Sequence, residues 1–282
     1  MSFGETAALG ALAGFTIFLG LPVGRLRMLS PRARVALAMF SVGVLVFLLV
    51  DVLAHGFEIA EGGVEAYKDG KGSFLHAAWL ALLLLGGFSL GSAGLAITER
   101  RLRARNAPPP VAGGAVDTLT AEDQQGLVDA ARAQALRTGL VIAAAIGLHN
   151  FAEGLAIGVS AQSGEIGLAT VLIIGFALHN TTEGFGIVGP LGDVRPSWRW
   201  LLVAGLIGGG PTFLGSMIGY SVTSEPLELA FYAVAGGAIL YVIGEIWHGM
   251  RRFGHRELGL ILLSCGFAAG VITDLIVVYG GG

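Results

Sequence analysis

Two copies of one six-residue pattern carry the side chains best suited to chemistry. Residues 149–154 read His-Asn-Phe-Ala-Glu-Gly, and residues 179–184 read His-Asn-Thr-Thr-Glu-Gly. In each copy the His and the Glu are four positions apart, so on a helix they lie on the same face. Imidazole nitrogen and carboxylate oxygen are ligands for Zn²⁺, Fe²⁺, Mn²⁺ and related ions. The two His and two Glu side chains therefore predict a site for one such ion, and the Asn carbonyl oxygens with the second Glu oxygens offer ligands for another.

The composition indicates that the elements holding these motifs lie in a membrane. Of the 282 residues, 54% are hydrophobic and 13% are charged, and this charged share is about half that of a typical soluble domain. The chain has 46 glycines, which suit a membrane bundle because small residues let helix backbones approach closely. The Arg residues are confined to short flanks of apolar segments, which argues against nucleic-acid binding. We therefore expect a multi-pass protein of a bacterial or archaeal cell membrane, surrounded by the lipid bilayer.

The apolar segments are long enough to cross a bilayer as helices, which takes about 20 residues. They predict an all-α membrane protein with eight transmembrane helices. The predicted spans are residues 5–23, 34–57, 74–98, 138–160, 165–189, 198–221, 226–248 and 257–279.

The basic residues alternate between the two sides of these spans. All 17 Lys and Arg residues except Lys68 and Lys71 fall in or beside the connections after the first, third, fifth and seventh spans. Because connections rich in Lys and Arg stay on the cytoplasmic side, these four are predicted to be cytoplasmic and both termini extracytoplasmic. A wrong number of spans would break the alternation, so the charge pattern favours eight.

One connection is much longer than the others and divides the chain. Residues 1–103 hold the first three helices, residues 104–136 are predicted to form a flexible cytoplasmic loop, and residues 137–282 hold the last five helices, all within a single membrane domain. The loop contains Pro108-Pro109-Pro110. It is expected to include a short helix from about residue 120 that merges into the fourth span.

The two motifs fall in the fourth and fifth spans, which run in opposite directions. They therefore form an inverted pair, and inverted repeats with a polar site near the middle of the membrane are typical of transporters. An alternative is that the polar side chains only join helices through hydrogen bonds, but identical spacing in two copies favours a metal site. The closing residues Gly154 and Gly184 are expected to allow close helix packing.

In these features the chain resembles the ZIP family of divalent metal transporters. The resemblance rests on the repeated His-Asn-x-x-Glu-Gly pattern, on the eight-span topology with a long cytoplasmic loop after the third span, and on Glu245 in the seventh span, where the family has a further acidic ligand. It implies an inverted-repeat bundle of 3+2+3 helices with a binuclear metal site. In that site the first ion is held by His149, Glu153, His179 and Glu183, and the second by Asn150, Asn180 and Glu245, with Glu153 and Glu183 bridging.

The resemblance also implies an activity. The chain is expected to transport divalent transition-metal ions, with import of Zn²⁺ toward the cytoplasm foremost and Cd²⁺, Fe²⁺ and Mn²⁺ as other substrates. The first, fourth, fifth and sixth helices are expected to move together against the other four, in the manner of an elevator, within a homodimer. Glycines along the sixth span give either a smooth surface for this movement or tight static packing. The ion is the cargo, and we expect neither an organic cofactor nor an enzymatic activity.

The sequence departs from the family pattern at two places. The family commonly has Pro just before the Glu of each motif, where this chain has Ala152 and Thr182. Because proline removes a backbone hydrogen bond, the fourth and fifth helices are expected to be straighter here. Many bacterial members have Glu-Pro in the sixth span, where this chain has Gly210-Pro211, so the kink is expected without the carboxylate.

Other polar residues allow two interpretations each. Asp51, His55 and Glu58 share one face of the second span, and form either an outer vestibule that collects cations or a structural pair beside an acidic loop. His248 is either an exit ligand or an anchor at the membrane surface. Asp274 is either part of a structural pair or of the entrance.

Two other functions use the same residue types. An intramembrane metallohydrolase would take the same ligands together with a water and a general base, but the His-Glu-x-x-His helix motif is missing. A metal sensor without transport would usually need a sizeable soluble output domain, and no predicted loop is large enough for one.

Overall fold

The computed structural model describes residues 1–26, 30–105, 121–162, 166–221, 224–251 and 253–279, and these residues contain helices and no strand. The described residues of each of the eight predicted ranges lie almost entirely on helix. Seven helical stretches among the described residues are long and apolar enough to cross a membrane. The helices in chain order are α1 (Phe3–Phe15), α2 (Ile17–Gly20), η1 (Leu21–Arg25), α3 (Pro31–Lys68), α4 (Phe74–Ser89), η2 (Leu90–Gly94), α5 (Leu95–Arg105), α6 (Ala121–Gln162), α7 (Ile166–Val188), η4 (Gly189–Leu191), α8 (Trp198–Ser221), α9 (Glu225–Arg251) and α10 (Arg256–Tyr279).

The helix starts follow ordinary capping chemistry. Ser2 caps α1 by accepting a hydrogen bond from the Glu5 backbone, and the Glu5 carboxylate accepts one from the Ser2 backbone in return. Ser30 and Ser73 cap α3 and α4 in the same way through their side-chain oxygens. Capped starts of this kind satisfy backbone N–H groups that have no partner within the helix, so the helix boundaries are set locally.

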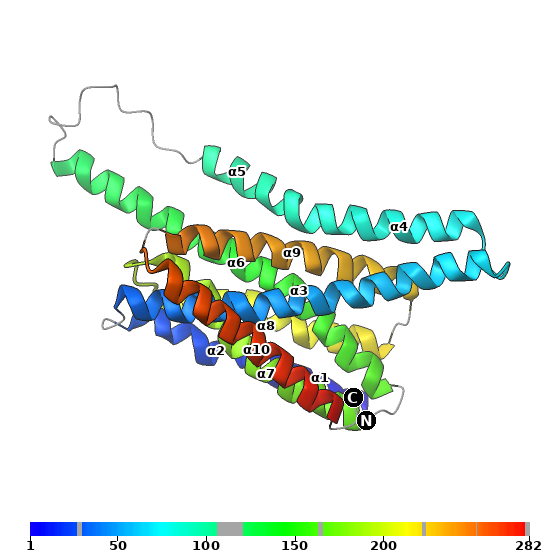
Figure 1. The fold of residues 1–282 in the computed structure, drawn as a ribbon. Helices are drawn as coiled ribbons and strands as arrows, with labels where there is room; N and C mark the ends of the chain where they lie inside the picture. Colours follow the sequence, from blue (N-terminus) through cyan, green and yellow to red (C-terminus); the bar gives the residue numbers. More distant parts are fainter. Residues whose placement is uncertain (27–29, 106–120, 163–165, 222–223, 252, 280–282) are drawn as a thin grey trace.

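Two helices extend beyond the predicted spans. Helix α3 continues to Lys68, about three turns past the predicted end at residue 57, and with α4 it forms the long hairpin at the right of Figure 1. Helix α6 begins at Ala121 and runs unbroken to Gln162, so the expected helix from about residue 120 does merge into the fourth predicted span. The rest of the predicted loop, residues 106–120, lies outside the described residues.

The helices pack in two groups. In the first group α8 lies between α1 and α6, and α7 packs on α1, α2 and α6. In the second group α3 packs on α10 and α9, and α4 packs on α9. The groups meet mainly where α6 packs on α9 and where α7 packs on α3 and α10.

Glycines bring helix backbones into contact inside each group. Gly154 on α6 faces the Thr212 carbonyl of α8, and Gly184 on α7 faces the carbonyl oxygen of Ile17 on α2, with no room for a Cβ at either position. Close packing at Gly154 and Gly184 is thus confirmed. Gly209, Gly215 and Gly219 of α8 behave likewise, since each faces a backbone carbonyl oxygen of another helix, whereas Gly210 faces open space. This favours static packing over a sliding surface for them.

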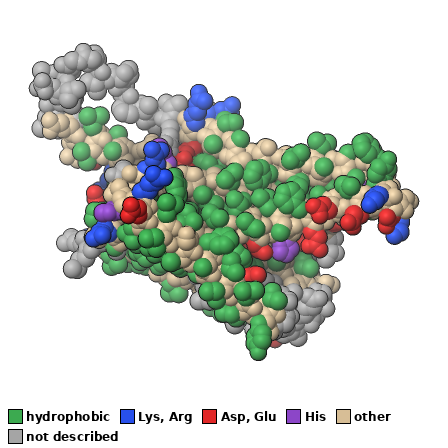
Figure 2. All heavy atoms as spheres, viewed as in Figure 1, with side chains coloured by type: hydrophobic (Ala, Val, Ile, Leu, Met, Phe, Trp, Pro, Cys, Tyr) green, Lys and Arg blue, Asp and Glu red, His purple; other side chains and the backbone are tan. Residues whose placement is uncertain are grey.

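The chain ends identify one end of the bundle. The Met1 amino group lies 3.5 Å from the carbonyl oxygen of Ala161 near the end of α6, and the Tyr220 hydroxyl donates to the Met1 carbonyl at 3.1 Å near the end of α8. Figure 1 shows the N-terminus and the C-terminal end of the chain together at this end. In Figure 2 the Lys and Arg side chains gather toward the ends of the bundle, and the face between them is mainly hydrophobic. This distribution suits a protein with a bilayer around its middle.

Candidate metal centre

The centre of the candidate site is formed by three side chains on the facing helices α6 and α7. Glu153 Oε1 lies 2.9 Å from His149 Nε2 and 2.5 Å from His179 Nε2. One ligand atom from each of the three residues falls within 4.8 Å of the others. His149 is 1% and Glu153 is 5% exposed, so both side chains are buried.

Glu183 and Asn150 extend this group. Glu183 Oε1 lies 3.9 Å from His149 Nε2. The Asn150 amide donates to Glu183 Oε2 at 3.1 Å and to the Gly208 carbonyl of α8 at 3.0 Å. Both Asn150 and Glu183 are completely buried. The Asn of one motif therefore positions the Glu of the other.

Asn180 occupies the matching place in the second motif. Its amide donates to the Ala13 carbonyl of α1 at 3.1 Å, and the residue is completely buried. Each Asn thus directs its N–H donors at backbone oxygen of a neighbouring helix and leaves its own carbonyl oxygen available. Thr181 of the second motif also donates to the carbonyl of Thr16, the residue that ends α1, at 3.3 Å.

Several buried acceptor atoms here have no hydrogen-bond partner among the described residues. They are Asn150 Oδ1, Asn180 Oδ1, Glu153 Oε2 and Glu183 Oε1. An unpaired buried polar atom costs about 1–3 kcal/mol, and more when it is charged. Four such oxygens beside two imidazoles can all be satisfied by cations. The set of nitrogen and oxygen atoms suits Zn²⁺, which binds His at about 2.0–2.1 Å and carboxylate at about 2.0–2.2 Å.

The local sequence keeps the two motif helices continuous. At the place of the family proline on α7, the Thr182 hydroxyl donates to the His179 carbonyl at 2.7 Å, and α6 and α7 are each assigned as one helix. Proline is instead found inside α8 as Pro211, three residues after Gly208. Helix α8 is continuous through Pro211. Because proline cannot donate a backbone hydrogen bond, the Ile207 carbonyl, one residue before the carbonyl that Asn150 contacts, lacks its usual helical donor.

A cavity of about 710 Å³ leads away from the three central side chains. Its walls come from α6 and α7 in the first helix group and from α3, α9 and α10 in the second. It reaches Ser160 and Val278, close to the ends of α6 and α10, so it extends toward the end of the bundle where the chain termini lie. The polar side chains on its wall, apart from the central three, are Asp51, His55, Ser160, Thr182, Glu228, Tyr232, Thr273 and Asp274.

Asp51, His55 and Asp274 therefore lie on the cavity wall, whereas Glu58 is not part of it. His55 Nδ1 lies 3.0 Å from the Asp51 backbone carbonyl and 3.9 Å from the Asp51 carboxylate. The Asp51 side chain is 39% exposed. Asp51 and His55 contact each other and also lie on the cavity wall, so the pair fits both interpretations.

Glu228 and Tyr232 also face this cavity, although the sequence pattern did not predict them as site residues. The Tyr232 hydroxyl donates to Glu228 Oε1 at 3.2 Å. Their four-residue spacing near the start of an apolar segment was the available signal, but the sequence alone does not tell which face of the helix meets the motif helices.

Glu245 is not brought together with the motif residues. It lies one turn after Tyr241 on α9, and Tyr241 donates to Glu99, which also accepts from Thr138 of α6 at 3.2 Å. Thr138 precedes His149 by three turns of α6, roughly 16 Å along the axis. These contacts place Tyr241, one turn before Glu245, near the first half of α6, and the role of Glu245 as a ligand stays a prediction. His248, in the last turn of α9, is exposed.

Comparisons with known proteins bear on this site. A family model described as ZIP Zinc transporter matches residues 112–273, a range that includes both motifs. The chain is 26% identical over 251 residues to the zinc transporter ZupT of Clostridium perfringens, covering 84% of this chain and 83% of that protein. It is 27% identical over 271 residues to the zinc transporter ZupT of Corynebacterium glutamicum, covering 93% of this chain and 97% of that protein.

Proposed function

Because the chain belongs to the ZIP zinc transporter family, we propose that this multi-pass membrane protein imports Zn²⁺ into the cytoplasm through the centre between α6 and α7. Zn²⁺ is the cargo, and Cd²⁺, Fe²⁺ and Mn²⁺ are the other ions with suitable ligand chemistry. The observation that carries the proposal is the buried group of His149, Glu153 and His179 at the inner end of a large cavity.

The proposed centre holds two ions. Oxygen and nitrogen atoms of His149, Glu153, His179 and Glu183 surround the first. The second uses the unpaired carbonyl oxygens of the two Asn side chains with the remaining Glu oxygens, which become bridges. One divalent ion already balances the charge of two carboxylates, so the second ion is supported by the number of unpaired buried oxygens and not by charge. We leave Glu245 outside this centre.

The ends of the bundle support the proposed direction of transport. We propose eight spans, with α7 as the fifth, and both termini outside the cell. The cavity extends toward the end where Met1 contacts Ala161, and the Arg-rich connections belong to the opposite end. Under the rule that basic connections stay in the cytoplasm, the centre in this structure is reached from outside.

The packing supports an elevator-type movement. The motif side chains and the backbone carbonyls that their Asn residues contact all belong to the first helix group, whereas α3, α9 and α10 of the second group complete the cavity wall. Glycine contacts tie backbones together within each group, as where Gly43 of α3 faces α10. We propose that the first group carries the ions past the second group. The second group is also the proposed surface for a homodimer.

The intramembrane metallohydrolase would use the same ligands. Both relatives are named as zinc transporters, and we therefore retain transport.

The test is uptake of Zn²⁺, Cd²⁺, Fe²⁺ and Mn²⁺ by the purified protein in liposomes. We expect Zn²⁺ uptake above that of protein-free liposomes, and a clear loss of it in Glu153→Ala and Glu183→Ala. Absence of uptake for all four ions under several gradients would refute the proposed function.

A further inference from the structure

A buried threonine on α8 carries an unsatisfied hydroxyl. Thr212 is completely buried, and its Oγ1 atom has no hydrogen-bond partner among the described residues. A threonine hydroxyl inside a helix ordinarily donates to the carbonyl oxygen one turn earlier, as Thr181 does to Ala177 on α7. For Thr212 that position is Gly208, whose carbonyl oxygen accepts the Asn150 amide instead. The hydroxyl is therefore left without a partner beside a motif residue.

Two contacts place this hydroxyl between the asparagines of the two motifs. On α8, Thr212 follows Gly208, the contact of the Asn150 amide, by one helical turn, about 6 Å along the axis. On α1, a Cβ at Gly14 would lie 2.9 Å from Thr212 Oγ1. The residue before Gly14 supplies the carbonyl oxygen that accepts from Asn180 at 3.1 Å. The Thr212 hydroxyl therefore borders the contact points of both Asn side chains.

Both asparagines offer the same kind of atom at this place. Asn150 Oδ1 and Asn180 Oδ1 are buried without hydrogen-bond partners among the described residues, like Thr212 Oγ1. The three residues are completely buried and come from three helices, α6, α7 and α8. An oxygen atom without a partner in the interior is costly, and a bound cation relieves that cost for all three at once. A hydroxyl oxygen has lone pairs that it can give to such a cation.

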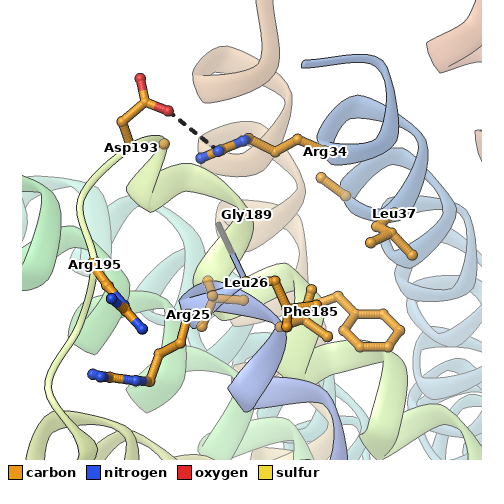
Figure 3. A pocket seen from close by; sticks show the side chains of 13 residues that line it. Arg25, Leu26, Arg34, Leu37, Phe185, Gly189, Asp193 and Arg195 are labelled. Atoms are coloured by element: carbon orange, nitrogen blue, oxygen red, sulfur yellow. Dashed lines mark hydrogen bonds and ion pairs between the residues drawn. The ribbon is translucent and has the colours of Figure 1, made fainter. Parts of the chain in front are cut away.

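A pocket at the end of α7 does not suit a cation. It has a volume of about 230 Å³, and its wall carries Arg25, Arg34 and Arg195 with Asp193 as the acidic residue. Figure 3 shows Arg34 directed at Asp193, from which it lies 3.3 Å, with Arg25 and Arg195 on the other side. The excess of positive charge repels a divalent ion. The second ion of the proposed centre therefore belongs among the buried oxygen atoms.

We propose that Thr212 Oγ1 is a ligand of the second ion, together with the carbonyl oxygens of Asn150 and Asn180. This proposal rests on the two-ion centre of the proposed function and adds a residue from outside both motifs. The second position then has oxygen ligands alone, because the bridging Glu153 and Glu183 also offer oxygen, whereas the first position includes two imidazoles. Oxygen ligands suit Mn²⁺, and imidazole suits Zn²⁺. The second position therefore favours Mn²⁺, and the first favours Zn²⁺.

The test measures binding of the second ion to the full-length protein in detergent. Protein loaded with one equivalent of Zn²⁺ is titrated with Mn²⁺, and unbound Mn²⁺ is measured by its electron paramagnetic resonance signal. The intact protein should bind one Mn²⁺. Thr212→Val keeps the shape of the side chain but removes the oxygen, and should weaken this binding at least about tenfold, the scale of one lost charge-assisted contact. Thr212→Ser keeps the hydroxyl and should retain most of the binding.

Ser216→Ala is the matched control. Ser216 lies one turn after Thr212 on α8 and is buried, but its hydroxyl donates to the Phe213 carbonyl at 2.8 Å. Its loss should leave Mn²⁺ binding unchanged. Thermal unfolding without added metal separates a ligand from a structural residue. Thr212→Val should unfold at the same temperature as the intact protein or higher, because it removes a hydroxyl without a partner, whereas Ser216→Ala loses a hydrogen bond and should unfold at a lower temperature.

The outcomes separate this proposal from the proposed function. Equal Mn²⁺ affinity of Thr212→Val and the intact protein overturns the proposal, and so does an equal loss of affinity in Ser216→Ala. If Thr212→Val does not fold, Thr212→Ala takes its place with the same expectation. Failure of the intact protein to bind a second ion overturns the two-ion centre together with this proposal. Because no step measures transport, each of these failures is distinct from absence of zinc uptake.

Discussion

Asn150 and Glu183, which stand on different helices and in different copies of the motif, are joined by a hydrogen bond of 3.1 Å. The same Asn150 amide contacts the Gly208 carbonyl of α8. One side chain therefore links three helices at the centre. The Asn of the pattern has two tasks: its amide fixes a carboxylate, and its unpaired carbonyl oxygen is available to an ion.

The first prediction concerns this link. Asn150→Ala should destabilise the protein by about 2–3 kcal/mol, because it leaves a buried carboxylate oxygen and a buried carbonyl without their donor. Asn180→Ala is the matched control, since it removes a hydrogen bond to the Ala13 carbonyl alone. Unfolding of both variants in detergent is compared by temperature and by denaturant. An equal or larger loss in Asn180→Ala would show that Asn150 does not hold the centre.

Glu153 should dominate ion binding, because it contacts both imidazoles at 2.5 and 2.9 Å. Replacing Glu153 by Gln keeps the shape but removes the charge, and should weaken Zn²⁺ binding at least about tenfold, the scale of one lost charged contact. Calorimetric titration of the purified protein measures this. Glu58→Gln, an exposed acid on α3 away from the cavity wall, should bind Zn²⁺ normally. Unchanged affinity in Glu153→Gln would remove Glu153 from the centre.

The vestibule side chains should affect capture of the ion more than its passage. Asp51→Asn lowers the negative charge of the cavity wall, so the zinc concentration for half-maximal uptake should rise severalfold while the maximal rate changes little. Glu61→Gln, also on α3 but exposed beyond the cavity, serves as the control. Uptake into liposomes over a range of Zn²⁺ concentrations separates the two quantities. A loss of maximal rate with unchanged half-saturation would assign Asp51 a role after capture.

Gly154 should tolerate no side chain. A Cβ there meets the Thr212 carbonyl, and forcing the helices apart should cost about 1–3 kcal/mol. Gly86→Ala on α4 provides the comparison, because a Cβ at that position meets nothing within 4 Å. Thermal unfolding in detergent compares both. Similar behaviour of the two variants would mean that α6 and α8 are not as closely packed as described.

Glu245 offers a test of the family-derived assignment against the geometry. Glu245→Gln should leave the number of bound Zn²⁺ ions unchanged, because the contacts of Tyr241 place the preceding turn of α9 near the first half of α6. Native mass spectrometry of the zinc-loaded protein counts the ions. Loss of one ion in this variant would return Glu245 to the centre and imply another arrangement of α9.

The parts of this picture that sequence predicts well depend on spacing within one helix. The i,i+4 pattern places His149 with Glu153, and composition identifies the helical spans, because both follow from the geometry of a single element. The closeness of His179 to Glu153 also follows once two adjacent helices run in opposite directions.

The features that the sequence does not predict depend on which helices pack together and on how far each helix is shifted along its neighbour. Glu228 and Tyr232 face the cavity because the start of α9 lies beside the last third of α6, where the ring centroids of Phe231 and Phe151 are 4.7 Å apart. Single-helix periodicity contains no information on this alignment, which is fixed by contacts between distant parts of the chain.

The most direct test of the central claim is the position of zinc in crystals of the zinc-loaded protein, from anomalous scattering at the zinc absorption edge. We expect a strong peak between α6 and α7, about 2.0–2.2 Å from His149 Nε2, His179 Nε2 and a Glu153 oxygen, with a second peak toward the Asn carbonyl oxygens. A single strong peak elsewhere, with none between the two motifs, would contradict it.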